Sequence, residues 1–344
     1  MKQLAIPAAI PSPVSALERA LGAEGVSALD PTVPAEVWRR ALAGPAAEFL
    51  SRPGKELRTT IVRAGWALGG GAPAAMSDRL PLVIELLHAG SLIVDDVQDA
   101  SLERRGAPAL HHVVGTPIAI NTGSWMYFWA LAEIAELGLP PATELAAHRA
   151  TTTTLVRCHQ GQALDLATRI ADLAIEDVAP VVAATTRLKT GALCKLAAEL
   201  GAISAGAPPE TTRAIARFGE AMGIGLQQLD DLGSLTCAHR RAKGREDLRG
   251  GRPTWPWAWL AEHHPFTWAR FAAMERAVAA AQDDDHADVD ALADALAATV
   301  GVAGRAHVRA TLDAALADLT CAVGESPTTL MIAAELRRME ESYG

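Results

Sequence analysis

The sequence predicts an all-α protein that folds as one helical bundle. Half of the 344 residues are apolar, and Ala and Leu, which are strong helix formers, dominate among them. Phe and Tyr are scarce and β-branched runs are short, so little of the sequence is suited to strands. Apolar residues recur at helical spacing along the chain, and the pattern does not alternate between strand and helix. Helices are therefore expected to follow helices throughout.

The expected elements begin after a proline-rich segment. Residues 1–35 are predicted to be a loosely ordered lead-in, and residues 36–344 a single domain without an internal linker. Gly and Pro punctuation ends the helical patterns, as at Pro53-Gly54, Gly69-Gly70-Gly71 and Pro140-Pro141. The expected helices cover residues 35–51, 56–69, 78–99, 116–136, 142–170, 176–201, 209–235, 253–261, 265–282, 287–299, 304–322 and 327–342.

Charge and composition exclude several classes of partner. The net charge is −9, whereas nucleic-acid binding needs clustered surplus Lys and Arg, so no nucleic-acid partner is expected. No apolar run reaches the roughly 18 residues of a membrane span, and Pro7, Pro11 and Pro13 break the apolar N-terminus. The four cysteines are dispersed, which fits a reducing cytoplasmic setting.

An acidic cluster ends the helix expected at residues 78–99. At 3.6 residues per turn, Asp95 and Asp99 fall on one face and Asp96 lies at its edge, so the three carboxylates are expected to converge. Like charges at this spacing repel, and Asp is a poor helix former. A solvated helix end is therefore the alternative interpretation of this cluster.

A second acidic pair, Asp230 and Asp231, also ends a long apolar helix. Two such clusters that face each other at the mouth of a bundle would offer oxygen ligands to Mg²⁺, which is often completed by substrate phosphates. Neither cluster contains His or Cys, so zinc or a redox metal is not expected.

Basic residues that suit a diphosphate lie near the first acidic cluster. Lys55 and Arg58 are three residues apart at a helix start, so they share a face near an N-terminus that itself attracts anions. Arg104 and Arg105 follow Asp99 closely. Each basic pair alone is also compatible with ordinary surface charge.

The order of these motifs resembles that of the trans-isoprenyl diphosphate synthases, or polyprenyl synthetases, over roughly residues 50–260. Gly54, Lys55 and Arg58 resemble the first basic motif of the family, and His88 stands where the family has Gln or His. The resemblance implies that these residues, together with Arg105, hold isopentenyl diphosphate.

The acidic motifs carry the resemblance further. Asp95, Asp96 and Asp99 are similar to the first Asp-rich motif, which binds the magnesium ions of the allylic diphosphate, and Arg104 would contact that diphosphate. The later motifs that match in order are Gly161-Gln162 with Asp165, Lys189-Thr190, Gln227 with Asp230-Asp231, Lys243, Asp247-Leu248 and Arg252. The resemblance implies catalytic roles for the acids and Lys189, and diphosphate-binding roles for Asp165, Thr190, Gln227, Lys243 and Arg252.

Four positions depart from the family pattern. Thr59 replaces a common Pro, Ser124 a common Asp, and Arg252 a usual Lys. Ser234 stands where the second Asp-rich motif has a third acid, and it is expected to hydrogen-bond a metal-bound water instead. Metal binding should then be weakened but kept.

The resemblance implies the type I isoprenoid synthase fold, a helical bundle around a deep apolar cavity. It also implies a homodimer that uses three Mg²⁺ ions, with Mn²⁺ as a substitute, to condense isopentenyl diphosphate with an allylic diphosphate.

The growing chain would pass the residues one and two turns before Asp95. The small side chains of Gly90 and Ser91, above Leu87, then favour a linear all-trans product of twenty carbons or slightly more. Trp125, Met126 and Trp129 would form a lower floor, or else ordinary core.

Two other functions stay open from the sequence. A class I terpene synthase on the same fold would cyclise an allylic diphosphate; Ser234 and the aromatic run from Trp255 to Trp259 favour it, because aromatic faces stabilise carbocations. The second diphosphate site argues against it, since a cyclase does not need one. A regulatory subunit would be expected to have lost its acids, most of which remain.

Overall fold

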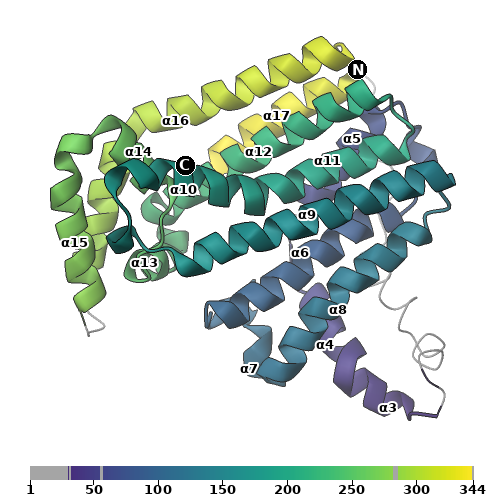
Figure 1. Ribbon diagram of the computed structural model, residues 1–344, viewed down its shortest axis with the longest axis horizontal. Helices are drawn as coiled ribbons and strands as arrows, with labels where there is room; N and C mark the ends of the chain where they lie inside the picture. The colour runs from purple at the N-terminus through teal and green to yellow at the C-terminus, as the bar shows by residue number, and fades with distance from the viewer. Residues whose placement is uncertain (1–29, 31, 55–56, 282–285, 343–344) are drawn as a thin grey trace. The chain divides into compact units, whose positions relative to one another are not determined.

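A computed structural model of the chain describes residues 30, 32–54, 57–281 and 286–342, apart from the side chain of His239. The described residues are predominantly helical, so the all-α prediction is confirmed (Figure 1). The expected lead-in falls almost entirely outside them.

Contacts divide the chain into two compact units. Unit 1 comprises Met1–Thr151 with Leu196–Thr212, and unit 2 comprises Thr152–Lys195 with Arg213–Gly344. The single-domain expectation stays a prediction.

Unit 1 contains the helices before the chain's midpoint and one short hairpin. Its elements are α3 (Ala35–Trp38), the π-helical turn η1 (Arg39–Ala43), α4 (Gly44–Leu50), α5 (Leu57–Leu68), η2 (Pro73–Ala75), α6 (Arg79–Gln98), β1 (Glu103–Arg104), β2 (Ala107–Pro108), α7 (Leu110–Val114) and α8 (Thr116–Ala135). The unit boundary falls inside α9 (Pro141–Ala167), α11 (Ala192–Ser204) and α12 (Pro209–Thr236).

Helix α6 lies at the centre of unit 1, packed against α5, α7 and α8. Two glycines set its close approach to α8: a Cβ on Gly90 would lie 2.6 Å from the Gly123 carbonyl oxygen, and one on Gly123 would lie 2.9 Å from the Gly90 carbonyl oxygen. Buried aliphatic side chains such as Ile84, Leu86 and Ile93 continue the contact along α6. The core of this unit therefore holds in place the helix that ends in the first acidic cluster.

Unit 2 contains most of the second half of the chain, apart from Leu196–Thr212. Its elements are η3 (Ile170–Asp172), α10 (Ile175–Thr186), the π-helical turn η4 (Arg187–Gly191), η5 (Ala238–Arg240), α13 (Arg241–Arg249), α14 (Trp255–His263), η6 (Pro265–Thr267), α15 (Trp268–Ala280), α16 (Ala287–Val323) and α17 (Pro327–Ser342). Helix α14 packs against α10 and α16, and α13 and α15 also lie on α16. The gap expected between residues 299 and 304 is a break at Gly301, whose φ of +50° is outside the helical region.

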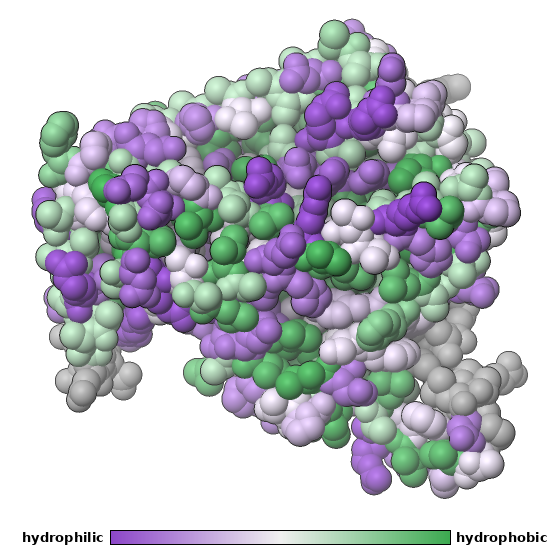
Figure 2. All heavy atoms as spheres, in the orientation of Figure 1, coloured by the Kyte–Doolittle hydropathy of each residue, from purple (hydrophilic) through white to green (hydrophobic). Residues whose placement is uncertain are grey.

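No helix among the described residues is long and apolar enough to cross a membrane. Hydrophilic and hydrophobic residues are interspersed over the face shown in Figure 2.

Candidate active site

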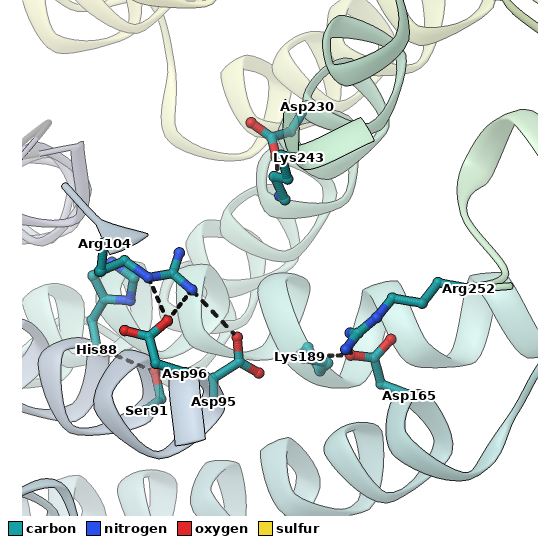
Figure 3. A network of polar contacts seen from close by, with 10 residues as sticks. All are labelled: His88, Ser91, Asp95, Asp96, Arg104, Asp165, Lys189, Asp230, Lys243 and Arg252. Carbon is teal, nitrogen blue, oxygen red and sulfur yellow. Dashed lines mark hydrogen bonds and ion pairs between the residues drawn. The ribbon is translucent and has the colours of Figure 1, made fainter. Parts of the chain in front are cut away.

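The acidic end of α6 carries one buried aspartate and two partly exposed ones. Asp96 is fully buried, and the Nε of Arg104 donates to its Oδ1 at 2.7 Å (Figure 3). Burial raises the pKa of Asp96, and pairing with Arg104 opposes that rise. Asp95 is partly exposed, with its Oδ2 3.9 Å from the same guanidinium, and Asp99 is the C-terminal cap of α6. The charges of all three acids act on Arg104, with Asp96 buried and Asp95 and Asp99 partly exposed.

The hairpin formed by β1 and β2 positions the two neighbouring arginines. Arg105 occupies its turn with a φ of +57°, a left-handed conformation that is uncommon for a side chain other than glycine. The buried Arg52 donates to the carbonyl oxygens of Arg104, at 3.0 Å, and Pro108, at 2.8 Å. It also pairs with Glu48. Arg52 thus fixes the strand ends from which Arg104 and Arg105 project.

A cationic cluster surrounds His88 on α6. Burial and the charges of Arg58, Arg105 and Arg104 hold the pKa of His88 well below its usual value, so its imidazole is neutral. The Nε of Arg58 is buried and has no hydrogen-bond partner. The guanidinium of Arg105 lies over the Phe49 ring and beside Gly54. Lys55, predicted to join this cluster, lies outside the described residues. An anion would balance these charges and satisfy the unpaired donor.

Three charged side chains converge in unit 2. Lys189 donates to Oδ2 of Asp165 at 2.5 Å, and Arg252 donates to the same oxygen at 3.1 Å (Figure 3). A Cβ on Gly161, one turn before Asp165, would lie 3.0 Å from Cγ of Lys189, so glycine there lets η4 lie close to α9. The π-helical turn and Gly161 together explain how Lys189 reaches Asp165.

Asp231 is held inside unit 2 by a hydrogen-bonded chain. Thr190 donates to Oε1 of Gln227, and Nε2 of Gln227 donates to Oδ1 of Asp231, each at 2.7 Å. The backbone N–H of Trp255 donates to the other oxygen at 2.9 Å. Burial nevertheless raises the pKa of Asp231 to about 7. Asp231 therefore links α12 to the start of α14.

Asp230 lies next to Asp231 but pairs with cations. Lys243 donates to its Oδ2 at 2.9 Å, and Arg240 pairs with its Oδ1. Burial would raise the pKa of Asp230, but these two cations outweigh it and lower the pKa. The Ser234 hydroxyl donates to the Asp231 carbonyl oxygen at 2.7 Å and is buried, so the expected contact with a metal-bound water is not supported.

The chain-length residues differ in their surroundings. Leu87 is buried in the core, and Gly90 is required by the contact with Gly123 rather than by an open wall. Ser91 is partly exposed, and its hydroxyl donates to the His88 carbonyl oxygen at 2.8 Å. On α8, Met126 and Trp129 are buried and Trp125 stacks on Trp129. Gly90 must be small for the packing of α6 on α8, whereas no such contact requires a small side chain at the partly exposed Ser91.

The donor set suits a hard cation. Among the described residues, no three His, Cys, Asp or Glu side chains form a preassembled metal cluster. Asp95 and Asp99 in unit 1, and Asp230 in unit 2, offer only carboxylate oxygens, the ligand type that Mg²⁺ takes when water and phosphate complete its shell. The carboxylates of each unit, taken by themselves, are therefore of the type that fits Mg²⁺ bound together with a phosphate ligand.

Comparison with known proteins decides the family. The family model described as Polyprenyl synthetase matches residues 39–295. The chain belongs to the polyprenyl synthetase family. It is 34% identical over 222 residues to a geranylgeranyl pyrophosphate synthase of Zymoseptoria tritici; the match covers 62% of this chain and 63% of that relative, less than two thirds of its length.

Solved structures support the fold of this polyprenyl synthetase family member. A geranylgeranyl pyrophosphate synthetase from Geoglobus acetivorans is similar with a TM-score of 0.76 at 21% identity, covering 96% of this chain and 97% of that one. A heptaprenyl diphosphate synthase from Staphylococcus aureus gives a TM-score of 0.74 at 19% identity, with coverages of 97% and 98%. At these identities the likeness establishes the fold alone.

Two arginines of this family member were missed by sequence reasoning. Arg52 anchors the β1–β2 hairpin, and Arg240 contacts Asp230. Arg52 directly precedes Pro53-Gly54, so its place beside a motif was a usable signal. Arg240 lies among Arg and Lys residues whose spacing gives no indication of which one turns inward.

The titration of Asp247 predicts a pH-dependent stability. Burial raises its pKa to about 6, against the opposing charges of Lys243 and Arg252. A carboxyl whose pKa is higher in the folded than in the unfolded chain adds stability at low pH, and this stability is lost as pH rises through 6. Asp247→Asn should therefore raise the free energy of unfolding by about 1–2 kcal/mol at pH 8, after allowance for solvent screening, and by much less at pH 4.5. Urea unfolding at both pH values measures this difference, and a gain of equal size at both would contradict it.

Proposed function

We propose that this protein is a Mg²⁺-dependent trans-prenyltransferase that joins isopentenyl diphosphate to an allylic diphosphate. The cationic cluster of Arg58, Arg105 and neutral His88 carries the proposal, because it leaves a buried guanidinium donor unsatisfied near His88, on the helix that ends in the first acidic cluster. A second set of cations accompanies the acids of unit 2, with Lys189 and Arg252 at Asp165. Two diphosphates need two such sets.

The residues divide into two binding roles under this proposal. Arg58, His88 and Arg105, with Lys55, hold isopentenyl diphosphate. The allylic diphosphate is bound by a second set of residues, which take up its charge as the C–O bond breaks. This set comprises Arg104, Lys189 and Lys243, together with Arg252, Thr190 and Gln227. Asp95, Asp99 and Asp230 would hold Mg²⁺, which would supply Lewis-acid stabilisation of that leaving group. Holding the double bond of isopentenyl diphosphate against the allylic cation then supplies much of the remaining rate gain.

His88 fits a hydrogen-bonding role better than a catalytic base. A proton taken by its imidazole would place a fourth positive charge among Arg58, Arg104 and Arg105, and burial together with these charges lowers the pKa of His88. The departing diphosphate is the base proposed for the final proton, since it gains charge as it leaves.

The product proposed is geranylgeranyl diphosphate or a slightly longer chain. The small side chain of Ser91, partly exposed one turn before Asp95, supports it, as does the likeness to a geranylgeranyl pyrophosphate synthase. Use of Mn²⁺ in place of Mg²⁺, a homodimer and a cytoplasmic setting are proposed with it, by likeness to the family.

The cyclase alternative gains no support from its aromatic residues. Trp255, Trp257 and Trp259 are buried on α14, which packs against α10 and α16. The rings of Trp255 and Trp259 contact each other, and the ring of Trp257 makes an edge contact with Trp268. They serve the core of unit 2, so the Trp run does not favour carbocation cyclisation.

A pair of substitutions tests the assignment of the two diphosphate sites. Arg58→Ala should raise the KM for isopentenyl diphosphate by about tenfold or more, the loss expected for a charge-assisted contact, with little change for the allylic substrate. Lys189→Ala is the matched variant and should show the reverse pattern. Steady-state kinetics with each substrate varied in turn measures both constants, and equal effects on both substrates would mean that the sites are wrongly separated.

A further inference from the structure

Both carboxylate oxygens of Asp230 are bound by cations of this chain. Lys243 donates to Oδ2 at 2.9 Å, and Arg240 pairs with Oδ1 through one guanidinium nitrogen. The side chain of Arg240 is mostly buried in this position. An acid proposed as a metal ligand thus lies between two positive charges, shown for Lys243 in Figure 3.

The packing of α13 on α12 explains why these cations reach Asp230. A Cβ on Gly244 would lie 2.3 Å from the Ser234 carbonyl oxygen, so glycine is needed for this close approach. Ser234 is buried beneath the contact, and its hydroxyl is used inside α12. The position expected to carry a third acid is therefore covered by α13, which carries Lys243, and Arg240 directly precedes this helix.

This arrangement places two positive charges beside the carboxylate that a metal ion would bind. Asp231 is hydrogen-bonded to Gln227 and to the backbone of Trp255, whereas Asp230 accepts hydrogen bonds from Arg240 and Lys243. A divalent cation at Asp230 would be repelled by both cations and would compete with a guanidinium for Oδ1. Arginine stays charged at any pH at which proteins fold, so a change in pH does not relieve this repulsion.

We propose that Arg240 is a positioning residue that occupies Oδ1 of Asp230 in the substrate-free protein and keeps divalent metal from binding there until a diphosphate arrives. This inference rests on the proposed function and deepens its metal site. A diphosphate brings several negative charges, which offset Arg240 and Lys243, so that metal and diphosphate bind together. The guanidinium N–H groups released from Asp230 are suited to phosphate oxygens.

Arg241 provides a matched control one residue away. Its guanidinium donates to Asp294 at 2.7 Å, to Asp290 at 3.3 Å and to the Leu235 carbonyl oxygen at 2.8 Å. Arg241→Gln removes the same charge from the same segment without removing a contact to Asp230.

Binding of Mn²⁺ alone to the full-length, substrate-free protein tests the inference without reliance on turnover. The electron paramagnetic resonance signal of free Mn²⁺ gives the dissociation constant. Arg240→Gln should bind Mn²⁺ about tenfold more tightly than the wild type, whereas Arg241→Gln should match the wild type. Equal affinities in the wild type and Arg240→Gln, or equal tightening by Arg241→Gln, would overturn the role of Arg240.

Inorganic pyrophosphate provides the second readout. With pyrophosphate present, the wild type should bind Mn²⁺ much more tightly than without it. The ratio of the Mn²⁺ dissociation constants of the wild type and Arg240→Gln should then become smaller. A ratio that pyrophosphate leaves unchanged also overturns the inference. If Arg240→Gln does not fold, Arg240→Met keeps the apolar stem and is expected to give the same result. A protein that shows this Mn²⁺ pattern but incorporates no isopentenyl diphosphate contradicts the proposed function and leaves the role of Arg240 intact.

Discussion

Asp95→Asn is expected to lower kcat by about 10²–10³-fold while the protein stays folded, the loss typical of one removed electrostatic element. Asp95 is partly exposed at the end of α6, so its carboxylate is accessible to a metal ion, and its Oδ2 lies 3.9 Å from the Arg104 guanidinium. The amide keeps the shape of the side chain and removes its charge. Turnover at saturating Mg²⁺ measures the effect, and a rate near that of the wild type would rule out Asp95 as a metal ligand.

Asp96→Asn is the matched control for that experiment. Asp96 is fully buried and paired with Arg104, whose guanidinium also lies 3.9 Å from Asp95. Asp96→Asn should therefore change the free energy of unfolding more than Asp95→Asn does. Thermal unfolding of both variants separates the loss of a ligand from the loss of a structural ion pair.

Ser91→Phe is expected to shorten the product while the initial rate stays comparable. Ser91 is partly exposed one turn before Asp95, and its small side chain leaves room for a chain that grows along α6. A phenyl ring would fill that path, and a close-packed wall such as the α6–α8 contact does not readily move aside.

Chromatography of the dephosphorylated products measures the change in length. Ser91→Ala is the control and should give the wild-type distribution, because it removes only the hydroxyl bonded to the His88 carbonyl oxygen. An unchanged distribution in an active Ser91→Phe variant would show that the chain does not grow along this face of α6, and the twenty-carbon estimate would lose its basis.

Helical periodicity predicted much of the fold, and it failed where tertiary contacts decide the backbone. Helices α6 and α8 lie within a residue of their expected ends, because their apolar pattern and Gly or Pro boundaries are local signals. Helix α13 was not expected, since Arg241–Arg249 is mostly charged and buries little beyond Gly244 and Leu248. The π-helical turn η4 interrupts the helix expected at residues 176–201 through packing across Gly161.

The candidate site was predictable in its residues more than in their orientation. Periodicity placed Asp96 at the edge of the acidic face, but only the hairpin that brings Arg104 to it decides that it is buried. Resemblance found Asp165 and Lys189, and the structure adds that they share an ion pair with Arg252. Neither Arg52 nor Arg240 belongs to a motif, so their contacts depend on the folded chain.

Incorporation of labelled isopentenyl diphosphate tests the central claim most directly. The protein is incubated with Mg²⁺, labelled isopentenyl diphosphate and each of dimethylallyl, geranyl and farnesyl diphosphate, and the products are identified by mass spectrometry. The account predicts label in a linear all-trans polyprenyl diphosphate of twenty carbons or slightly more. Consumption of the allylic diphosphate without incorporation of label, with release of a cyclic hydrocarbon, would contradict it.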